Sequence, residues 1–249
     1  MFVEKENYYE IEEFENIGVR AVYTKFSAGN LSLYCLNEEE KVEENRRKIL
    51  KDIGAEDKKL FFARQTHSDN IKIIREEDIA KEYDDIDGFI TDRKDVVILT
   101  QYADCLPVYF CDTENKVIGS AHGGWKGLFN GIHIKMVDIM VNEYGINIEN
   151  IKVAAGVGIK SCCYQVGEDF YKNFKNKFEK IADSSFEINA NGYYFDLEIF
   201  AKLTLMERGI KEENITLSGT CTMCSGKFNS FRKDKEMSGR NGAIIAFKK

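Results

Sequence analysis

Histidine, proline and tryptophan are scarce in this chain, whose 249 residues include three histidines, one proline and one tryptophan. Long apolar runs are absent as well. No stretch approaches the ~18 apolar residues that a membrane-spanning helix requires. The first residues contain no basic segment followed by an apolar one. We therefore expect neither a membrane partner nor a signal peptide.

Positive charge is also in deficit, because 35 Lys and Arg face 42 Asp and Glu and leave a net charge of −7. This balance disfavours a nucleic-acid partner, which would need a basic footprint. The seven cysteines are odd in number and scattered, which favours reduced thiols in a cytoplasmic protein. A hydrophobic content of 43% can fill the core of one compact domain over residues 1–249, and we expect a monomer.

The scarce residue types are concentrated in three short segments, 64–70, 103–108 and 121–127. These segments contain two of the three histidines, His67 and His122, and also Cys105. Two imidazoles and a thiolate make up three quarters of a tetrahedral zinc shell, with the fourth place open for water or substrate.

The spacing of these three residues fits no short local ligand motif, since 38 positions separate His67 from Cys105 and 17 separate Cys105 from His122. The fold would have to assemble such a site. Each residue also has a structural alternative, because a buried cysteine behaves as a small and inert hydrophobic residue.

Short apolar runs alternate with longer amphipathic segments along the chain. The runs predict strands at 19–26, 60–64, 71–74, 96–100, 107–111, 117–121, 151–155, 215–218 and 243–247. Helices are predicted from a cap at Asn37 to a stop at Gly54, over 127–144, over 168–181, and from a cap at Asp196 to Arg208. This mixture predicts an α/β fold (mixed α+β) packed in layers.

Two side-chain patterns within the predicted helices indicate packing. Phe170, Phe174 and Phe178 are spaced by four, which places them on one helical face and favours a core position. His133 falls inside the helix predicted over 127–144, so we interpret it as an ordinary helix residue and not as a ligand.

Cys105 and His122 both follow predicted strands, where loops build sites on rigid elements. The glycines after His122 would let the backbone approach a ligand, and Lys126 would add a charge for an anion. The alternative for this glycine-rich run is a tight strand-to-helix turn. Arg232, Lys233 and Arg240 are either further anion contacts or ordinary surface charge.

In this order, the three segments resemble the signature of the YfiH-like family, also called the laccase-domain or polyphenol-oxidase-like family. They match its patterns Gln-x-His, Ala-Asp-Cys-x-Pro and Ala-His-x-Gly-Trp-x-Gly. The resemblance runs from about residue 18 to the end of the chain. Further matching segments are 29–33, 87–91, 156–164, 221–224, 228–232 and 238–240. At Lys126 the family pattern commonly has arginine, and lysine lacks the bidentate fork of a guanidinium.

The resemblance implies a single YfiH-like domain, a layered sandwich of two β-sheets flanked by helices. It also implies zinc-dependent phosphorolysis of adenosine, inosine or S-methyl-5'-thioadenosine, together with deamination of adenosine. The partners would then be a purine nucleoside and phosphate, and the zinc ligands would be His67, Cys105 and His122. Zinc at such a site lowers the pKa of a bound water toward ~7, which suits attack on the purine ring.

The remaining candidate residues are assigned by their chemistry. Asp104 is a candidate for moving protons, and Lys126 and Arg232 are candidates for binding phosphate. Candidates for binding the ribose or the base are Asn30, Arg64 and Gln65.

Three alternatives stay open at this point. A copper-binding polyphenol oxidase is one, although three histidines cannot supply a blue-copper centre and a copper cluster, and Cu²⁺ could still occupy the His and Cys site. A cysteine-dependent hydrolase or amidase acting on peptide or peptidoglycan precursors is another, with Cys105 as the nucleophile and His122 as its base. The third is a metal-binding or scaffold protein without catalytic activity.

Cys221 and Cys224 form a Cys-x-x-Cys unit, which is typical of half a zinc site or of a redox pair. No second unit of this kind accompanies it at zinc-finger spacing. We therefore expect these two cysteines to serve packing or turn structure.

Overall fold

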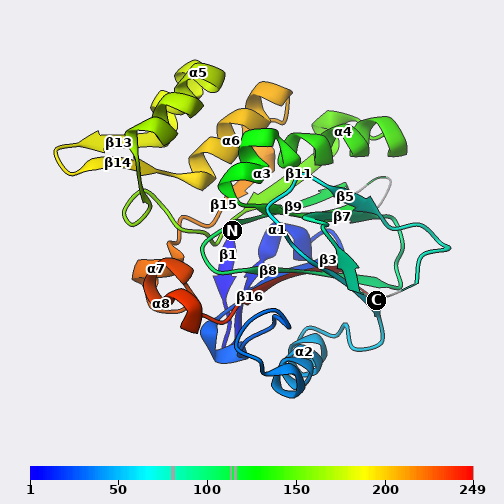
Figure 1. Cartoon of the computed structure of the whole chain (residues 1–249). Coiled ribbons are helices and arrows are strands. Elements are labelled where there is room, and N and C mark those ends of the chain that lie inside the picture. Colours follow the sequence, from blue (N-terminus) through cyan, green and yellow to red (C-terminus); the bar gives the residue numbers. More distant parts are fainter. Residues whose placement is uncertain (80–81, 113, 115–116, 249) are drawn as a thin grey trace.

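Two β-sheets pack face to face at the centre of the protein, and helices cover the outer side of each (Figure 1). The computed structural model describes residues 1–79, 82–112, 114 and 117–248. Helices α3 (Trp125–Asn130), α4 (Ile132–Tyr144) and α6 (Leu197–Arg208) lie over one sheet, and α2 (Glu39–Asp52) lies beyond the other (Figure 1). This layered arrangement confirms the predicted mixed α+β sandwich.

One sheet has seven strands in the order β1-β2-β3-β16-β8-β4-β6, and the other has six in the order β15-β11-β9-β10-β7-β5. The strands of the seven-stranded sheet are β1 (Phe2–Glu4), β2 (Tyr8–Ile11), β3 (Val19–Thr24), β16 (Asn241–Phe247), β8 (Val96–Tyr102), β4 (Lys59–Arg64) and β6 (Glu82–Asp84). Those of the six-stranded sheet are β15 (Ile215–Leu217), β11 (Ile151–Ala155), β9 (Leu106–Asp112), β10 (Val117–Gly123), β7 (Gly88–Thr91) and β5 (Ile71–Ile73).

All nine predicted strands form, with ends displaced by at most two residues. Strand β8 shows why the prediction works, because successive side chains of a strand point to opposite faces of its sheet. Val96 and Ile98 pack between the two sheets, whereas Val97 and Leu99 pack against α2. Since both faces are covered, β8, β9 and β10 are buried along their whole length and have nearly continuous apolar sequences.

The predicted helices form, but several of their ends differ from the predicted positions. The helices are α1 (Glu12–Glu15), α2 (Glu39–Asp52), α3 (Trp125–Asn130), α4 (Ile132–Tyr144), α5 (Glu168–Ser185), α6 (Leu197–Arg208), α7 (Thr222–Ser225) and α8 (Phe231–Asp234). The predicted cap at Asn37 is wrong, because Asn37 adopts a φ of 48° and α2 begins two residues later without a side-chain cap. The helix predicted over 127–144 is divided into α3 and α4 by Gly131, whose φ is 87°.

Asp196 caps α6 as predicted, with its carboxylate accepting a hydrogen bond from the backbone N–H of Ile199 at 3.1 Å. Helix α5 continues four residues beyond its predicted end and packs beside a third sheet. The strands of that sheet, which the sequence analysis missed, are β12 (Gln165–Val166), β14 (Gly192–Phe195) and β13 (Phe186–Asn189). Asn191 and Gly192 at the turn between β13 and β14 are the signal that could have revealed it.

The topology brings five strand ends to one edge of the sandwich. Strands β4 and β8 run parallel, so their carboxyl ends meet at that edge. The chain then crosses from the seven-stranded to the six-stranded sheet through residues 103–105, which join β8 to β9. The end of β10 pairs with the starts of β9 and β7 at the same place. The three segments that contain the scarce residues therefore converge.

Within the part of the chain that the structure describes, none of the helices combines the length and the apolar character that crossing a bilayer demands.

An aromatic cluster packs α5 against α6 and against β14 of the third sheet, and Phe174 lies at its centre. Its ring centroid is 4.8 Å from that of Phe195 and 5.1 Å from that of Phe200. Phe174 is 1% exposed, which confirms the predicted core role of the phenylalanine stripe.

Replacing Phe174 by alanine should lower the free energy of unfolding by about 3–5 kcal/mol, because the substitution leaves a cavity among packed rings. Phe26→Ala is the matched control: Phe26 is 67% exposed, so its loss should change stability by no more than about 0.5 kcal/mol. Urea titration, followed by tryptophan fluorescence and circular dichroism, measures the change in the free energy of unfolding for each substitution. Equal effects of the two substitutions would contradict the packing described here.

Candidate active site

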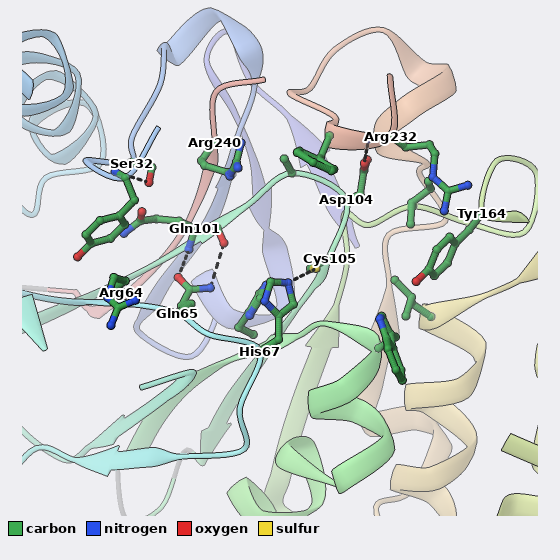
Figure 2. A pocket seen from close by; sticks show the side chains of 17 residues that line it. Ser32, Arg64, Gln65, His67, Gln101, Asp104, Cys105, Tyr164, Arg232 and Arg240 are labelled. Carbon is green, nitrogen blue, oxygen red and sulfur yellow. Dashed lines mark hydrogen bonds between the residues drawn. The ribbon is translucent and has the colours of Figure 1, made fainter. Parts of the chain in front are cut away.

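His67, Cys105 and His122 come together at the edge where the strands converge (Figure 2). His67 lies in the loop after β4 with a φ of 63°, Cys105 in the turn between β8 and β9, and His122 at the penultimate position of β10. One ligand atom from each lies within 4.8 Å of the others, and the Cys105 Sγ is 3.7 Å from the His67 Nε2. The fold thus assembles the set that the sequence spacing alone could not.

A buried carboxylate, Asp87, organises both histidines. Its Oδ1 lies 2.7 Å from the Nδ1 of His122 and accepts a hydrogen bond from the backbone N–H of His67 at 3.1 Å. Its Oδ2 accepts bonds from the backbone N–H groups of Thr66 and Ser68 at 3.0 and 2.9 Å. The Asp87 side chain is fully buried and directly precedes β7. The sequence analysis did not identify this residue as functional, although the Asp-Gly turn at 87–88 was the available signal.

The electrostatics of the group follow from these contacts. Although burial raises it, the hydrogen bond and positive charge of His122 hold the pKa of Asp87 down at about 2. Burial lowers the pKa of His122, but Cys105 and Asp87 raise it to about 9. Burial likewise raises the pKa of Cys105, while His122 and His67 lower it to about 6. Without a metal, the site therefore favours a thiolate beside an imidazolium.

The donor set fits a single metal ion. Two imidazole nitrogens and one thiolate match the N and S ligands of zinc, whose bonds of about 2.0–2.3 Å place neighbouring ligand atoms between 3 and 4 Å apart, at roughly the observed spacing. Asp87 holds the Nδ1 of His122, which leaves the Nε2 to face the ion, as is usual for metal-bound histidine. Three protein ligands leave one position open, which is typical of catalytic sites.

Gly124 keeps space for this arrangement. A Cβ at this position would lie 2.6 Å from the Cδ2 of His67 and 3.4 Å from the Sγ of Cys105. At Gly123 a Cβ would lie 2.7 Å from the carbonyl oxygen of Leu106. The sequence allows two interpretations of the glycine-rich run, approach of the backbone to a ligand and a tight strand-to-helix turn. Gly123 ends β10 and Gly124 is the N-cap of α3, which confirms the turn, while approach to a ligand stays a prediction. In the structure these glycines let the site's own segments pack closely.

The three residues open onto a cavity of about 430 Å³, a size typical of pockets for small organic ligands. Aromatic side chains line it, namely Tyr34, Trp125, Tyr164 and Phe231. Three guanidinium groups also line it, those of Arg64, Arg232 and Arg240. Among the described lining residues Asp104 is the one carboxylate, so positive charge prevails.

Gln65 and Asp104 lie in the lining, with their polar groups already engaged. The Gln65 amide accepts from the backbone N–H of Gln101 at 2.7 Å and donates to the carbonyl of the same residue at 3.0 Å (Figure 2). Asp104 accepts from the Thr222 hydroxyl and the Arg232 backbone N–H, both at 2.6 Å. Asp104 therefore ties the C-terminal segment to the site, and its role in proton transfer stays a prediction.

The other predicted binding residues separate into two groups. Arg64 and Arg232 lie on opposite sides of His67 in the cavity wall (Figure 2). Asn30 is buried outside the described lining, where its side chain accepts from the backbone N–H groups of Ser32 and Arg240 at 3.1 and 2.9 Å. Lys126 also lies outside that lining, with its Nζ 5.6 Å from the centroid of the Trp125 ring.

Changing Asp87 to Asn should weaken zinc binding about 10–100-fold, because the amide cannot hold His122 as the charged carboxylate does. Competition against a chromogenic chelator measures the affinity. Asp92→Asn is the matched control, since Asp92 is an exposed aspartate away from the site. Unchanged affinity in Asp87→Asn would contradict the assigned role.

Gly124→Ala should displace the His67 ring and so remove one ligand, while leaving the fold intact because the ring can move outward. We expect a loss of zinc affinity beyond the effect of Asp87→Asn and little change in melting temperature. Gly167→Ala is the control, since a Cβ there meets nothing within 4 Å. Zinc affinity equal to that of Gly167→Ala would show that this glycine does not shape the site.

Comparisons with known proteins agree with the fold. The sequence model of the family described as "Multi-copper polyphenol oxidoreductase laccase" matches residues 17–248. A purine nucleoside phosphorylase of Borreliella burgdorferi is 33% identical over 235 residues, which cover 94% of each chain. A protein named adenosine deaminase RL5 is 27% identical over 86% of this chain and 85% of its own length. The crystal structure of the Bacillus licheniformis hypothetical protein YfiH superimposes with a TM-score of 0.92 at 30% identity, covering 99% of this chain and 98% of its own. The chain therefore belongs to the laccase-like family that includes YfiH.

Proposed function

We propose that the protein is a zinc-dependent purine nucleoside phosphorylase acting on adenosine, inosine and S-methyl-5'-thioadenosine. The observation that carries this proposal is the position of His67, Cys105 and His122, which open onto a cavity lined by guanidinium groups and aromatic rings. Guanidinium groups suit phosphate, and aromatic rings suit a purine. Relatives named purine nucleoside phosphorylase support the same activity.

In phosphorolysis a phosphate oxygen attacks the anomeric carbon of the ribose while the bond to the purine nitrogen breaks, giving ribose 1-phosphate and the free base. The departing purine takes up a proton. Zn²⁺ bound by His67, Cys105 and His122 would supply Lewis acidity at the open position.

The residues of the chain would perform the binding and the orientation. Arg232 and Arg240 are the proposed phosphate ligands, because the planar guanidinium matches phosphate with two parallel hydrogen bonds. Each is held in place: Arg232 donates to the carbonyl of Gln165 at 3.1 Å, and Arg240 donates to that of Ser238 at 2.6 Å. Tyr164 lies under Arg232, with the guanidinium carbon 5.1 Å from its ring centroid. These contacts pre-order the anion site.

We also propose deamination of adenosine at the same site, in which water replaces the exocyclic amine and ammonia leaves. This reaction needs the same cavity and an activated water, and it requires no phosphate. The relative named adenosine deaminase supports it.

The family description mentions several copper ions, and the histidines of this chain argue against such a centre. His133 is the third and last histidine. It is buried in α4, where its Nε2 lies 2.6 Å from the Thr204 hydroxyl and burial lowers its pKa to about 3. Only two histidines remain for the site, too few for a blue-copper centre with a cluster beside it.

A cysteine-dependent hydrolase is the second candidate, and the Asp87, His122 and Cys105 arrangement favours it. The carboxylate orients the imidazole at 2.7 Å, and the imidazole stabilises the thiolate. Such a chain of contacts is the arrangement that activates a cysteine nucleophile. This reaction requires metal-free protein, which separates it from the first candidate.

The test is release of hypoxanthine from inosine, measured with and without phosphate. We expect turnover that requires phosphate and zinc and is lost in Cys105→Ala. In Arg232→Gln and Arg240→Gln the KM for phosphate should rise by about 10–100-fold, the effect of losing a charge-assisted hydrogen bond worth about 1.5–3 kcal/mol. Lys126→Gln is the matched control and should leave this KM unchanged.

Three results would change the assignment. A raised phosphate KM in Lys126→Gln alone would move the anion site to Lys126. Phosphate-independent release of base would contradict phosphorolysis. Activity toward peptides or amides in chelator-treated protein, abolished by thiol alkylation, would favour the cysteine hydrolase.

A further inference from the structure

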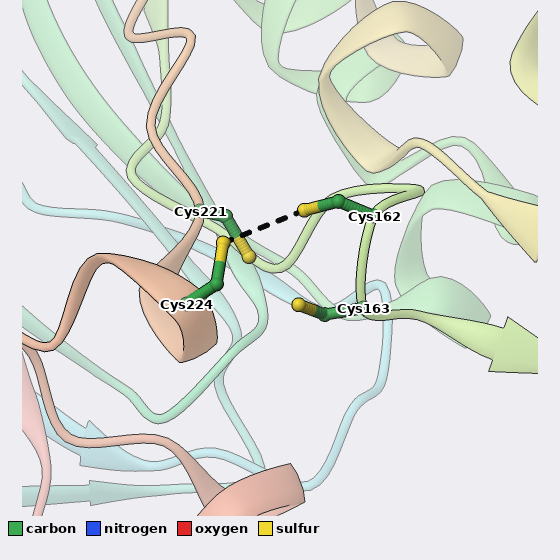
Figure 3. Close-up of side chains that lie close together, drawn as sticks. All are labelled: Cys162, Cys163, Cys221 and Cys224. Carbon is green, nitrogen blue, oxygen red and sulfur yellow. Dashed lines mark hydrogen bonds between the residues drawn. The ribbon is translucent and has the colours of Figure 1, made fainter.

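We propose that Cys162, Cys163, Cys221 and Cys224 form a second metal site, which binds one zinc ion and has a structural role (Figure 3). It is separate from the His67, Cys105 and His122 group and uses none of its residues. The proposal does not depend on the purine assignment.

The sulfur positions fit a single ion. All four Sγ atoms lie within 4.8 Å of one another, and those of Cys162 and Cys224 are 3.6 Å apart. Four thiolates at 2.3 Å from a tetrahedral zinc lie about 3.8 Å from each other. The observed cluster therefore needs only small side-chain adjustments to close around one ion. Multi-iron clusters need more widely spaced thiolates.

Backbone contacts hold the two pairs of cysteines close to each other, so the site does not depend on the ion for its assembly. The segment with Cys162 and Cys163 is a turn in which the N–H groups of Cys163 and Tyr164 donate to the Lys160 carbonyl at 2.9 and 2.8 Å. In the other segment, Cys221 is the N-cap of α7. A β-bridge joins Gly158 to Cys221, and the Thr222 N–H donates to the Gly158 carbonyl at 3.1 Å.

Packing alone does not explain this gathering of thiols, so the proposal differs from the packing or turn role that the sequence predicts for Cys221 and Cys224. Cys162 and Cys224 are exposed, whereas structural cysteines in a core are buried. All four thiols are free, and the 3.6 Å between the Cys162 and Cys224 sulfurs is well beyond the roughly 2.05 Å of a disulfide bond. Four thiolates select soft ions, and a tetrahedral sulfur shell around one ion indicates zinc. Because all four ligands come from the protein, the shell is closed, which is typical of a structural site.

The ion would stabilise one wall of the active-site cavity. Tyr164, which lines the cavity, directly follows Cys163. Thr222, between Cys221 and Cys224, donates its hydroxyl hydrogen to Asp104 at 2.6 Å. Zinc bound to the cysteines would therefore link the segment with Tyr164 to the segment that holds Asp104.

The test measures zinc per chain in protein purified under reducing conditions and dialysed against a chelator-treated buffer. Work in a Cys105→Ala background removes the first site from the count, so failure of the purine assignment leaves the result interpretable. We expect two zinc ions in the wild type and one in Cys105→Ala. Adding Cys162→Ser and Cys224→Ser should reduce this to none, whereas adding Cys35→Ala, the control thiol, should leave one.

Cobalt substitution of the Cys105→Ala protein keeps the test independent of whether the cysteine variants fold. We expect the intense visible absorption and thiolate charge-transfer bands of tetrahedral cobalt with sulfur ligands. A Cys105→Ala protein that takes up neither zinc nor cobalt would overturn the proposal. So would a full equivalent of zinc that survives loss of Cys162 and Cys224.

Discussion

The hydrogen bonds of one buried carboxylate, Asp87, hold the candidate site together. Its two oxygens collect three consecutive backbone N–H groups around His67 and the Nδ1 of His122. A charge buried this deeply is costly unless every lone pair is satisfied, and here the partners are the elements that carry the two histidines. Asp87 thus fixes His67 in a left-handed loop conformation that has little stability of its own.

The sandwich supplies the second constraint, because its topology directs the chain from one sheet to the other at the edge where the site lies. Strand β10 places His122, the turn between β8 and β9 places Cys105, and a loop places His67. The arginines of the cavity lie at the end of β4, in α8 and directly before β16. The C-terminal segment closes the cavity and is attached by Asp104, which bonds to Thr222 and Arg232. Function therefore depends on contacts between segments that are more than 100 residues apart, as well as on the local motifs.

Much of this could be predicted from the sequence, because strands buried on both faces have nearly continuous apolar sequences and scarce residues mark the candidate metal ligands. Asp87 was missed because an aspartate before glycine is also an ordinary turn residue. The four-cysteine cluster was missed because one half is an adjacent pair, Cys162 and Cys163, and only the fold brings it to Cys221 and Cys224. The binding roles of Asn30 and Lys126 stay predictions, because they depend on side-chain direction, which periodicity does not give for loops and short helices.

Anomalous diffraction from crystals of the purified protein at the zinc absorption edge tests the central claim most directly, since it locates the ion among named side chains. We predict a peak bounded by His67, Cys105 and His122, with the open fourth coordination position facing the cavity and with both carboxylate oxygens of Asp87 outside bonding distance. A peak completed by a fourth protein ligand, or no peak at this site in zinc-replete protein, would contradict the account of an open catalytic metal site.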